Sequence, residues 1–134
     1  MTTTTETQSP AAVVRAFYEA LGRGDIAAVK ASMSPEITVH MPGKSPLAGL
    51  YSGPDAVVGF LGRMQELAGG TFRAELREVF TNGDQVVAVH HGTGTRGGRQ
   101  LDADAALLFE VTGGQVTSCT VHQARQDGWD DFFS

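Results

Sequence analysis

The sequence predicts an α+β fold in which a curved antiparallel sheet packs against helices. Apolar residues recur at helical spacing in the first half of the chain and alternate with polar residues in the second half. Glycine-rich turns separate the alternating segments, and turns this short join antiparallel neighbours. With 134 residues, 41% of them hydrophobic, we expect one packed domain over residues 9–134. Residues 1–8 are polar and rich in threonine, which is typical of a disordered tail.

Three helices are predicted before the alternation begins. The first starts at Ser9–Pro10, a capping residue followed by proline at the first helical position. The second starts at Asp25 and runs to about Met33, and the third starts near Pro54. Their buried stripes are expected to consist of Val13, Phe17, Ala20 and Leu21, then Ile26, Val29 and Met33, and finally Val57, Val58, Leu61, Met64 and Leu67 or Ala68.

Strands account for most of the remaining chain. One short strand is predicted over residues 37–41, followed by an ordered loop over residues 42–53 that is rich in proline and glycine. Four longer strands follow, joined by tight turns such as Asn82–Gly83. We place these strands at residues 72–80, 86–95, 100–111 and 116–124, and a terminal helix or aromatic clasp at Trp129, Phe132 and Phe133.

Composition excludes several classes of partner. The 10 Lys and Arg residues against 15 Asp and Glu give a formal charge of −5, which argues against a nucleic-acid surface. No apolar run approaches the roughly 20 residues of a membrane span, and the start of the chain does not resemble a signal peptide. The single cysteine, Cys119, fits a reducing compartment. We therefore expect a cytoplasmic protein with no nucleic-acid or membrane partner.

One strand predicts a cavity beneath the helices. Its residues Leu101, Ala105 and Phe109 lie on one face because side chains alternate along a strand, and Asp102 and Asp104 lie on the other. Alanines on the apolar face leave volume that a small hydrophobic ligand can occupy, although the helices can also fill this space completely. The two aspartates can form an acidic dyad, but solvent or a subunit interface explains them better.

Adjacent histidines introduce a polar group into this lining. His90 and His91 lie on one strand, so they point to opposite faces. If Val87, Val89 and His91 face inward, His91 is the pocket residue, and a β-bulge would exchange the two. A buried histidine is often simply satisfied by a backbone carbonyl. Its functional interpretation is a general acid or base, because imidazole titrates near neutral pH.

Two further histidines lie near strand ends. His40 ends the first strand, and His122 lies toward the end of the last one, where simple alternation places it opposite Cys119 and Val121. Convergence of His40, His91 and His122 would suit a metal ion. The chain has no helical histidine pair at i, i+4 and no cysteine cluster, so we expect no metal site.

The order of these elements and several short motifs resembles the SnoaL-like branch of the NTF2-like superfamily over residues 9–133. The motifs are Phe17-Tyr18-Glu19-Ala20-Leu21, Gly24-Asp25, His40-Met41-Pro42-Gly43, residues 49–57 and Gly114-Gln115-Val116. Relatives include polyketide cyclases, ketosteroid isomerases and limonene-type epoxide hydrolases. The resemblance implies a cone-shaped barrel packed on three helices, an apolar pocket, no cofactor and a homodimer, and some members only bind ligands.

The family's catalytic groups carry over poorly. At the positions of the steroid isomerases' tyrosine and two aspartates, this chain has Phe17, Met41 and about Ala105, which excludes their mechanism. In the limonene-type hydrolases an asparagine precedes the Met-Pro of the first strand, and this position is His40 here. Their Arg-x-Asp pair falls at about Val89 and His91, and their last-strand aspartate falls near Val121 or His122. The resemblance therefore implies that histidines line the pocket and that imidazole replaces carboxylate chemistry.

We thus expect an enzyme that acts on a hydrophobic small molecule, polyketide-like or another secondary metabolite, by cyclisation, isomerisation, dehydration or epoxide opening. His91 is the leading acid or base, His40 orients or protonates the substrate or a water, and His122 assists. The alternative is a non-catalytic binding or dimerisation module, and Ala106 and Leu108 on the outer side of the sheet favour a homodimer. Expected substrate contacts are Phe17, Tyr18, Met41, Tyr51, Leu61, Val89, Ala105, Leu107, Cys119 and Val121.

Overall fold

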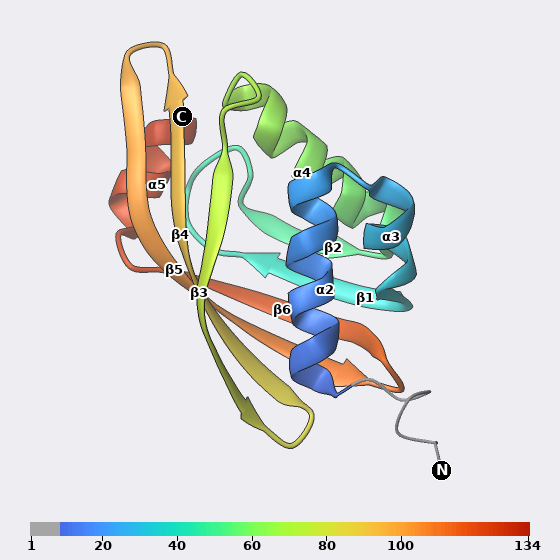
Figure 1. Cartoon of the computed structure of the whole chain (residues 1–134). Coiled ribbons are helices and arrows are strands. Elements are labelled where there is room, and N and C mark those ends of the chain that lie inside the picture. Colours follow the sequence, from blue (N-terminus) through green and yellow to red (C-terminus); the bar gives the residue numbers. More distant parts are fainter. Residues whose placement is uncertain (1–8) are drawn as a thin grey trace.

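The computed structural model describes residues 9–134, so the tail predicted over residues 1–8 lies outside the described residues. Four helices and six strands make up this part of the chain (Figure 1). In chain order they are α2 (Pro10–Arg23), α3 (Ile26–Ala31), β1 (Met33–Met41), β2 (Gly49–Ser52), α4 (Pro54–Leu67), β3 (Arg73–Asn82), β4 (Gln85–Arg96), β5 (Arg99–Thr112), β6 (Gln115–Gln123) and α5 (Gln126–Phe133).

The helix starts follow the predicted capping residues. The Ser9 side chain accepts a hydrogen bond from the amide of Ala12, and the Asp25 side chain accepts one from the amide of Ala28. Gly24 ends α2 in the left-handed region at φ 68°, where glycine carries no steric cost. The second helix ends at Ala31 instead of Met33, because Met33 already pairs with Val116 as the first residue of β1.

All six strands form one curved, mixed sheet in the order β2-β1-β6-β5-β4-β3. The predicted antiparallel hairpins from β3 to β6 are confirmed, whereas β1 runs parallel to β6. The sheet is open, with β2 and β3 at its edges. Within the predicted loop over residues 42–53, the strand β2 pairs antiparallel with β1. Strand β2 was missed because its four residues are all exposed or half-buried and show no alternation.

The two faces of the sheet differ in what covers them. Helices α2, α3 and α4 lie over the inner face, where Leu101, Ala105 and Phe109 of β5 are buried (Figure 1). The predicted face of β5 is therefore confirmed. On the outer face Leu50 is 67% exposed and Phe80 is 55% exposed. None of the helices in residues 9–134 combines the length and the apolar character needed to cross a membrane.

Candidate functional site

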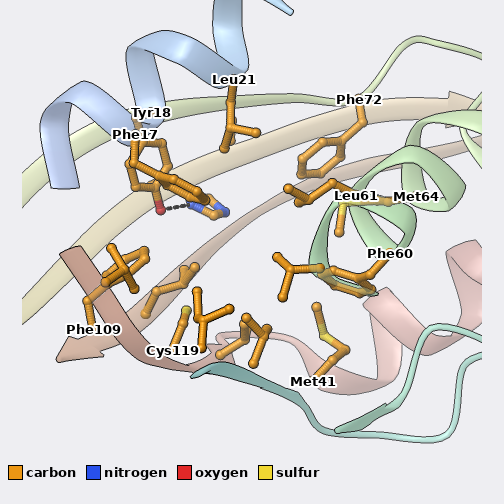
Figure 2. A pocket seen from close by; sticks show the side chains of 18 of the residues that line it. Phe17, Tyr18, Leu21, Met41, Phe60, Leu61, Met64, Phe72, Phe109 and Cys119 are labelled. Carbon is orange, nitrogen blue, oxygen red and sulfur yellow. Dashed lines mark hydrogen bonds between the residues drawn. The ribbon is translucent and has the colours of Figure 1, made fainter. Parts of the chain in front are cut away.

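A cavity of about 90 Å³ lies between α2, α4 and the inner face of the sheet. Its walls are almost entirely apolar (Figure 2). Aromatic rings contribute much of this surface, because Phe17 and Tyr18 of α2 pack edge to face against Phe109 of β5. The predicted hydrophobic hollow therefore exists, and the helices do not fill it. Of the expected substrate contacts, it is lined by Phe17, Tyr18, Met41, Leu61, Leu107, Cys119 and Val121.

Three expected contacts lie elsewhere. The ring of Tyr51 stacks against Phe60, with centroids 4.5 Å apart, and its hydroxyl donates a hydrogen bond to the Leu47 carbonyl. Val89 lies on the outer face of β4, and Ala105 is buried opposite His90 without reaching the cavity. The lining also contains residues that were not among the expected substrate contacts, including Leu21, Phe60, Met64, Phe72 and His90.

A hydrogen-bonded pair of side chains brings polarity into this cavity. The Tyr18 hydroxyl of α2 and Nδ1 of His90 on β4 lie 2.7 Å apart, marked by the dashed line in Figure 2. Their rings also meet edge to face at 5.6 Å. His90 is only 8% exposed. Side chains alternate along β4, so His90 lies on the same face as Val86 and Ala88. Both of these residues are fully buried, which shows that this face points inward.

Burial keeps both members of this pair uncharged. It lowers the pKa of His90 to about 4, an effect that the Asp104 carboxylate partly opposes. Burial also raises the pKa of Tyr18 above its ordinary value, with a smaller contribution from Cys119. At neutral pH the pair is thus an imidazole and a phenol. Two tautomers satisfy it: Tyr18 donates to Nδ1, or Nδ1–H donates to the Tyr18 oxygen.

Other polar groups in the lining are few. Burial raises the pKa of the Cys119 thiol to about 12, so the thiol stays protonated and is a poor nucleophile. Among residues 9–134, Nε1 of Trp129 is a buried side-chain nitrogen without a hydrogen-bond partner. Aspartate and glutamate are absent from the lining formed by the described residues. The only titratable base that the described part of the chain offers to this cavity is therefore His90.

An open groove of about 540 Å³ lies beside the cavity, between α2, α4 and the start of β3. Arg23 and Arg73 are the charged residues of its lining. The groove and the cavity adjoin, because they share six wall residues: Tyr18, Leu21, Leu61, Met64, Phe72 and Ala74.

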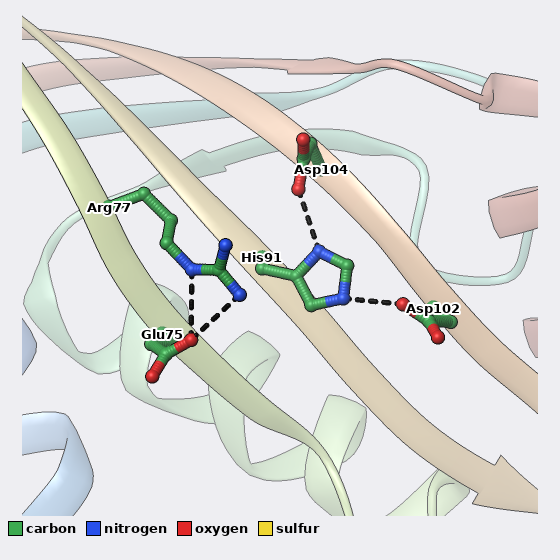
Figure 3. A network of polar contacts seen from close by, with 5 residues as sticks. All are labelled: Glu75, Arg77, His91, Asp102 and Asp104. Carbon is green, nitrogen blue, oxygen red and sulfur yellow. Dashed lines mark hydrogen bonds and ion pairs between the residues drawn. The ribbon is translucent and has the colours of Figure 1, made fainter.

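The interpretation of His91 as the pocket histidine is wrong. His91 lies on the outer face between two carboxylates: Nδ1 is 2.7 Å from Asp104, and Nε2 contacts Asp102 (Figure 3). The hydrogen bond to Asp104 is the main reason why the pKa of His91 is raised. The register explains its direction. The turn at Gly97–Gly98 pairs Arg96 with Arg99, which places His91 opposite Asp104 and His90 opposite Ala105.

The other two predicted catalytic histidines also lie outside the cavity. His40 is exposed on β1, where it pairs with Thr120 of β6 and Leu50 of β2. His122 is exposed on β6 opposite Ala106. The expectation that His40, His91 and His122 converge in the pocket is therefore wrong, because strand pairing turns each of them away from the helices.

Comparison with known proteins supports the family that the motifs suggested. The chain is 35% identical to the uncharacterised protein Rv0034 of Mycobacterium tuberculosis over 91% of this chain and 94% of that protein. Bal32a, from a soil-derived mobile gene cassette, has a similar structure with a TM-score of 0.90 and 32% identity, covering 93% of this chain and 96% of its own.

Two more distant structures carry family names. An NTF2-like protein from Burkholderia xenovorans LB400 has a TM-score of 0.81 and 25% identity, over 96% of this chain and 98% of that one. A candidate polyketide cyclase (xcc0381) from Xanthomonas campestris has a TM-score of 0.72 and 25% identity, over 93% and 96%. The SnoaL-like domain family matches residues 14–119. This chain therefore belongs to the SnoaL-like family and has the NTF2-like fold.

Proposed function

We propose that the protein is a cofactor-independent enzyme that moves a proton within a hydrophobic carbonyl compound, by isomerisation or cyclisation. The single observation that carries this proposal is the Tyr18–His90 pair, buried in an otherwise apolar cavity. Membership of the SnoaL-like family and the similarity to a candidate polyketide cyclase support the same class of reaction.

The chemistry follows from the tautomer in which Nδ1–H donates to the Tyr18 oxygen. Nε2 of His90 then carries a lone pair and removes a proton from the carbon next to the ligand carbonyl. The Tyr18 hydroxyl donates a hydrogen bond to the carbonyl oxygen, where the negative charge of the enolate develops. The imidazolium then returns its proton to another carbon of the conjugated enolate, which isomerises the compound. Alternatively, the enolate carbon attacks a second carbonyl group of the same molecule, which closes a ring, and the imidazolium protonates the resulting alkoxide.

The environment suits this step because the base is always available. A histidine with a pKa of about 4 is unprotonated throughout the neutral range. Its conjugate acid is strongly acidic, so it returns the proton readily. Apolar walls also strengthen the hydrogen bond from Tyr18 to an enolate oxygen relative to the same bond in water. General acid–base catalysis of this kind contributes roughly 10²- to 10⁴-fold in rate.

Proton abstraction can be tested without knowing the natural substrate. The wild-type protein is incubated in D₂O with simple benzo-fused ketones such as 1-indanone and 2-tetralone. NMR then follows the exchange of the protons next to the carbonyl. We expect His90→Gln to lower the protein-dependent exchange rate by about 10²-fold or more, and Tyr18→Phe to lower it less. His91→Gln is the matched comparison on the outer face and should retain the rate.

A second candidate function is binding without chemistry, which the lack of a carboxylate in the described lining favours. The same experiment separates the two functions. If ketones bind in the cavity but their protons exchange no faster than in buffer, the proposed enzymatic function is refuted and the binding function is supported. An unchanged exchange rate in His90→Gln would remove His90 from the proposed mechanism.

We also propose that the protein is a homodimer through the outer face of the sheet. Strand pairing aligns Phe80 of β3, Val87 of β4 and Leu108 of β5 in one row on this face. Phe80 is largely exposed, and the other two are half-buried. A second copy that packs on this row would remove apolar area from water.

A further inference from the structure

Two helical glycines leave space in the groove beside the cavity. Gly22 near the end of α2 and Gly62 on α4 both line the groove. Neither has a positive φ, and a Cβ at either position would meet no atom within 4 Å. Glycine in a helix costs about 0.5–1 kcal/mol relative to alanine, so backbone geometry and packing do not explain these residues. Their effect is to leave open space between α2 and α4, which make only marginal contact with each other.

Charge in the groove is of one sign. Arg23 and Arg73 line it, and no aspartate or glutamate of the described residues does, in a chain whose formal charge is −5. Asp25 does not line the groove, but its carboxylate lies 3.5 Å from the Arg23 guanidinium. Both side chains are well exposed, so this ion pair is weak. The groove is therefore a local positive site on an acidic protein.

Hydrogen bonds hold the Arg73 side chain in the lining of the groove. Its Nη1 donates to the carbonyls of Gly70 and Phe72, at 3.0 and 2.8 Å. Its Nε and Nη2 have no hydrogen-bond or ion-pair partner among residues 9–134. The nearby amide of Gln65 is already occupied by both backbone groups of Phe72. A guanidinium fixed on one side and free on the other is suited to bind a carboxylate or sulfonate.

We infer that the ligand of this site is an amphiphilic organic anion, whose anionic group binds in the groove at Arg73 and Arg23 while its apolar part enters the cavity. Tyr18, Leu21 and Phe72 line both the groove and the cavity, and Figure 2 shows these three side chains in the cavity wall. This inference rests on the proposed function in taking the cavity as the substrate site, and it adds the chemical class of the substrate.

Two fluorescent probes test the anionic group directly. 8-Anilino-1-naphthalenesulfonate and N-phenyl-1-naphthylamine share one ring system and differ in the sulfonate. We expect the wild-type protein to bind the sulfonate probe more tightly, and Arg73→Gln to weaken its binding about tenfold while leaving the neutral probe unchanged. Arg63→Gln removes an exposed arginine of α4 that does not line the groove, and it should change neither affinity.

A steric variant tests the route. Gly62→Phe places a ring in the open space of the groove and should weaken both probes by about tenfold or more. Gly59→Phe is the matched control, because Gly59 lies on the same helix, is equally unobstructed and does not line the groove. Circular dichroism confirms that both variants fold.

Each outcome decides between the inference and the proposed function. Equal affinity of the wild-type protein for the two probes would overturn the anionic ligand class even if ketone exchange proceeds. Identical behaviour of Gly62→Phe and Gly59→Phe would overturn the groove as the place where the ligand binds. If the protein prefers the sulfonate probe through Arg73 but catalyses no ketone exchange, the anionic ligand class is supported and only the enzymatic proposal is refuted.

Discussion

Burial of His90 makes the stability of the fold depend on pH in a calculable way. Its pKa falls from 6.5 to about 4 on folding, mainly through burial. Between these values the unfolded chain holds a proton on His90 that the folded chain does not, so the free energy of unfolding falls as pH drops from about 6.5 to 4. A shift of this size corresponds to about 3 kcal/mol over that window. Below pH 4 both states are protonated and the loss stops.

The test compares the wild-type protein with His90→Gln, which has no titrating group at this position. Urea unfolding at pH 7 and at pH 4 gives the change in free energy for each protein, and contributions from other groups cancel in the difference. We expect the wild-type protein to lose about 3 kcal/mol more than His90→Gln. Equal losses in His90→Gln and the wild type would show that His90 is not buried as an uncharged group.

Three further predictions follow from the described geometry. The rate of ketone exchange should rise with pH through about 4 and then stay level past pH 8, because His90 is the base and Tyr18 keeps its proton; an inflection near pH 6.5 would point instead to an exposed imidazole. Asp104→Asn should lower the pKa of His91 in an NMR titration, since that carboxylate is the main cause of the raised value. In the wild type this pair stabilises the fold below the ordinary histidine pKa and loses its effect as pH rises through the raised one, so Asp104→Asn should be more destabilising at pH 5.5 than at pH 9. Leu108→Asp should convert a dimer to a monomer in sedimentation velocity, and a wild-type monomer would refute the proposed outer-face interface.

Local signals were enough to place most elements. Ser9, Asp25 and Gly24 perform at the helix ends the roles that their side chains and backbone preferences predict. The hairpin between β4 and β5 closes at Gly97–Gly98 as expected, and both glycines have positive φ. Each of these features depends on a few neighbouring residues, so the sequence alone can specify it.

Long-range pairing was harder to predict. The parallel contact of β1 with β6 joins residues about 80 positions apart, such as Val39 and Cys119, and no local pattern marks it. By contrast, local features of the sequence do indicate which of His90 and His91 faces the cavity. Counting back from the turn at Gly97–Gly98 pairs His91 with Asp104, and alternation along β5 places Asp104 on the outer face. The turn and the alternation of side chains together therefore specify that His90 faces the helices.

Trp129, described above as part of the cavity wall, is the only tryptophan of the chain. Its indole packs against Phe72 and Phe133 at the α5 side of the chamber. The tryptophan emission of the protein therefore originates from a single position beside the chamber. A compound that enters the chamber changes the surroundings of this indole, so the tryptophan fluorescence of unlabelled protein provides a direct readout for screening candidate ligands.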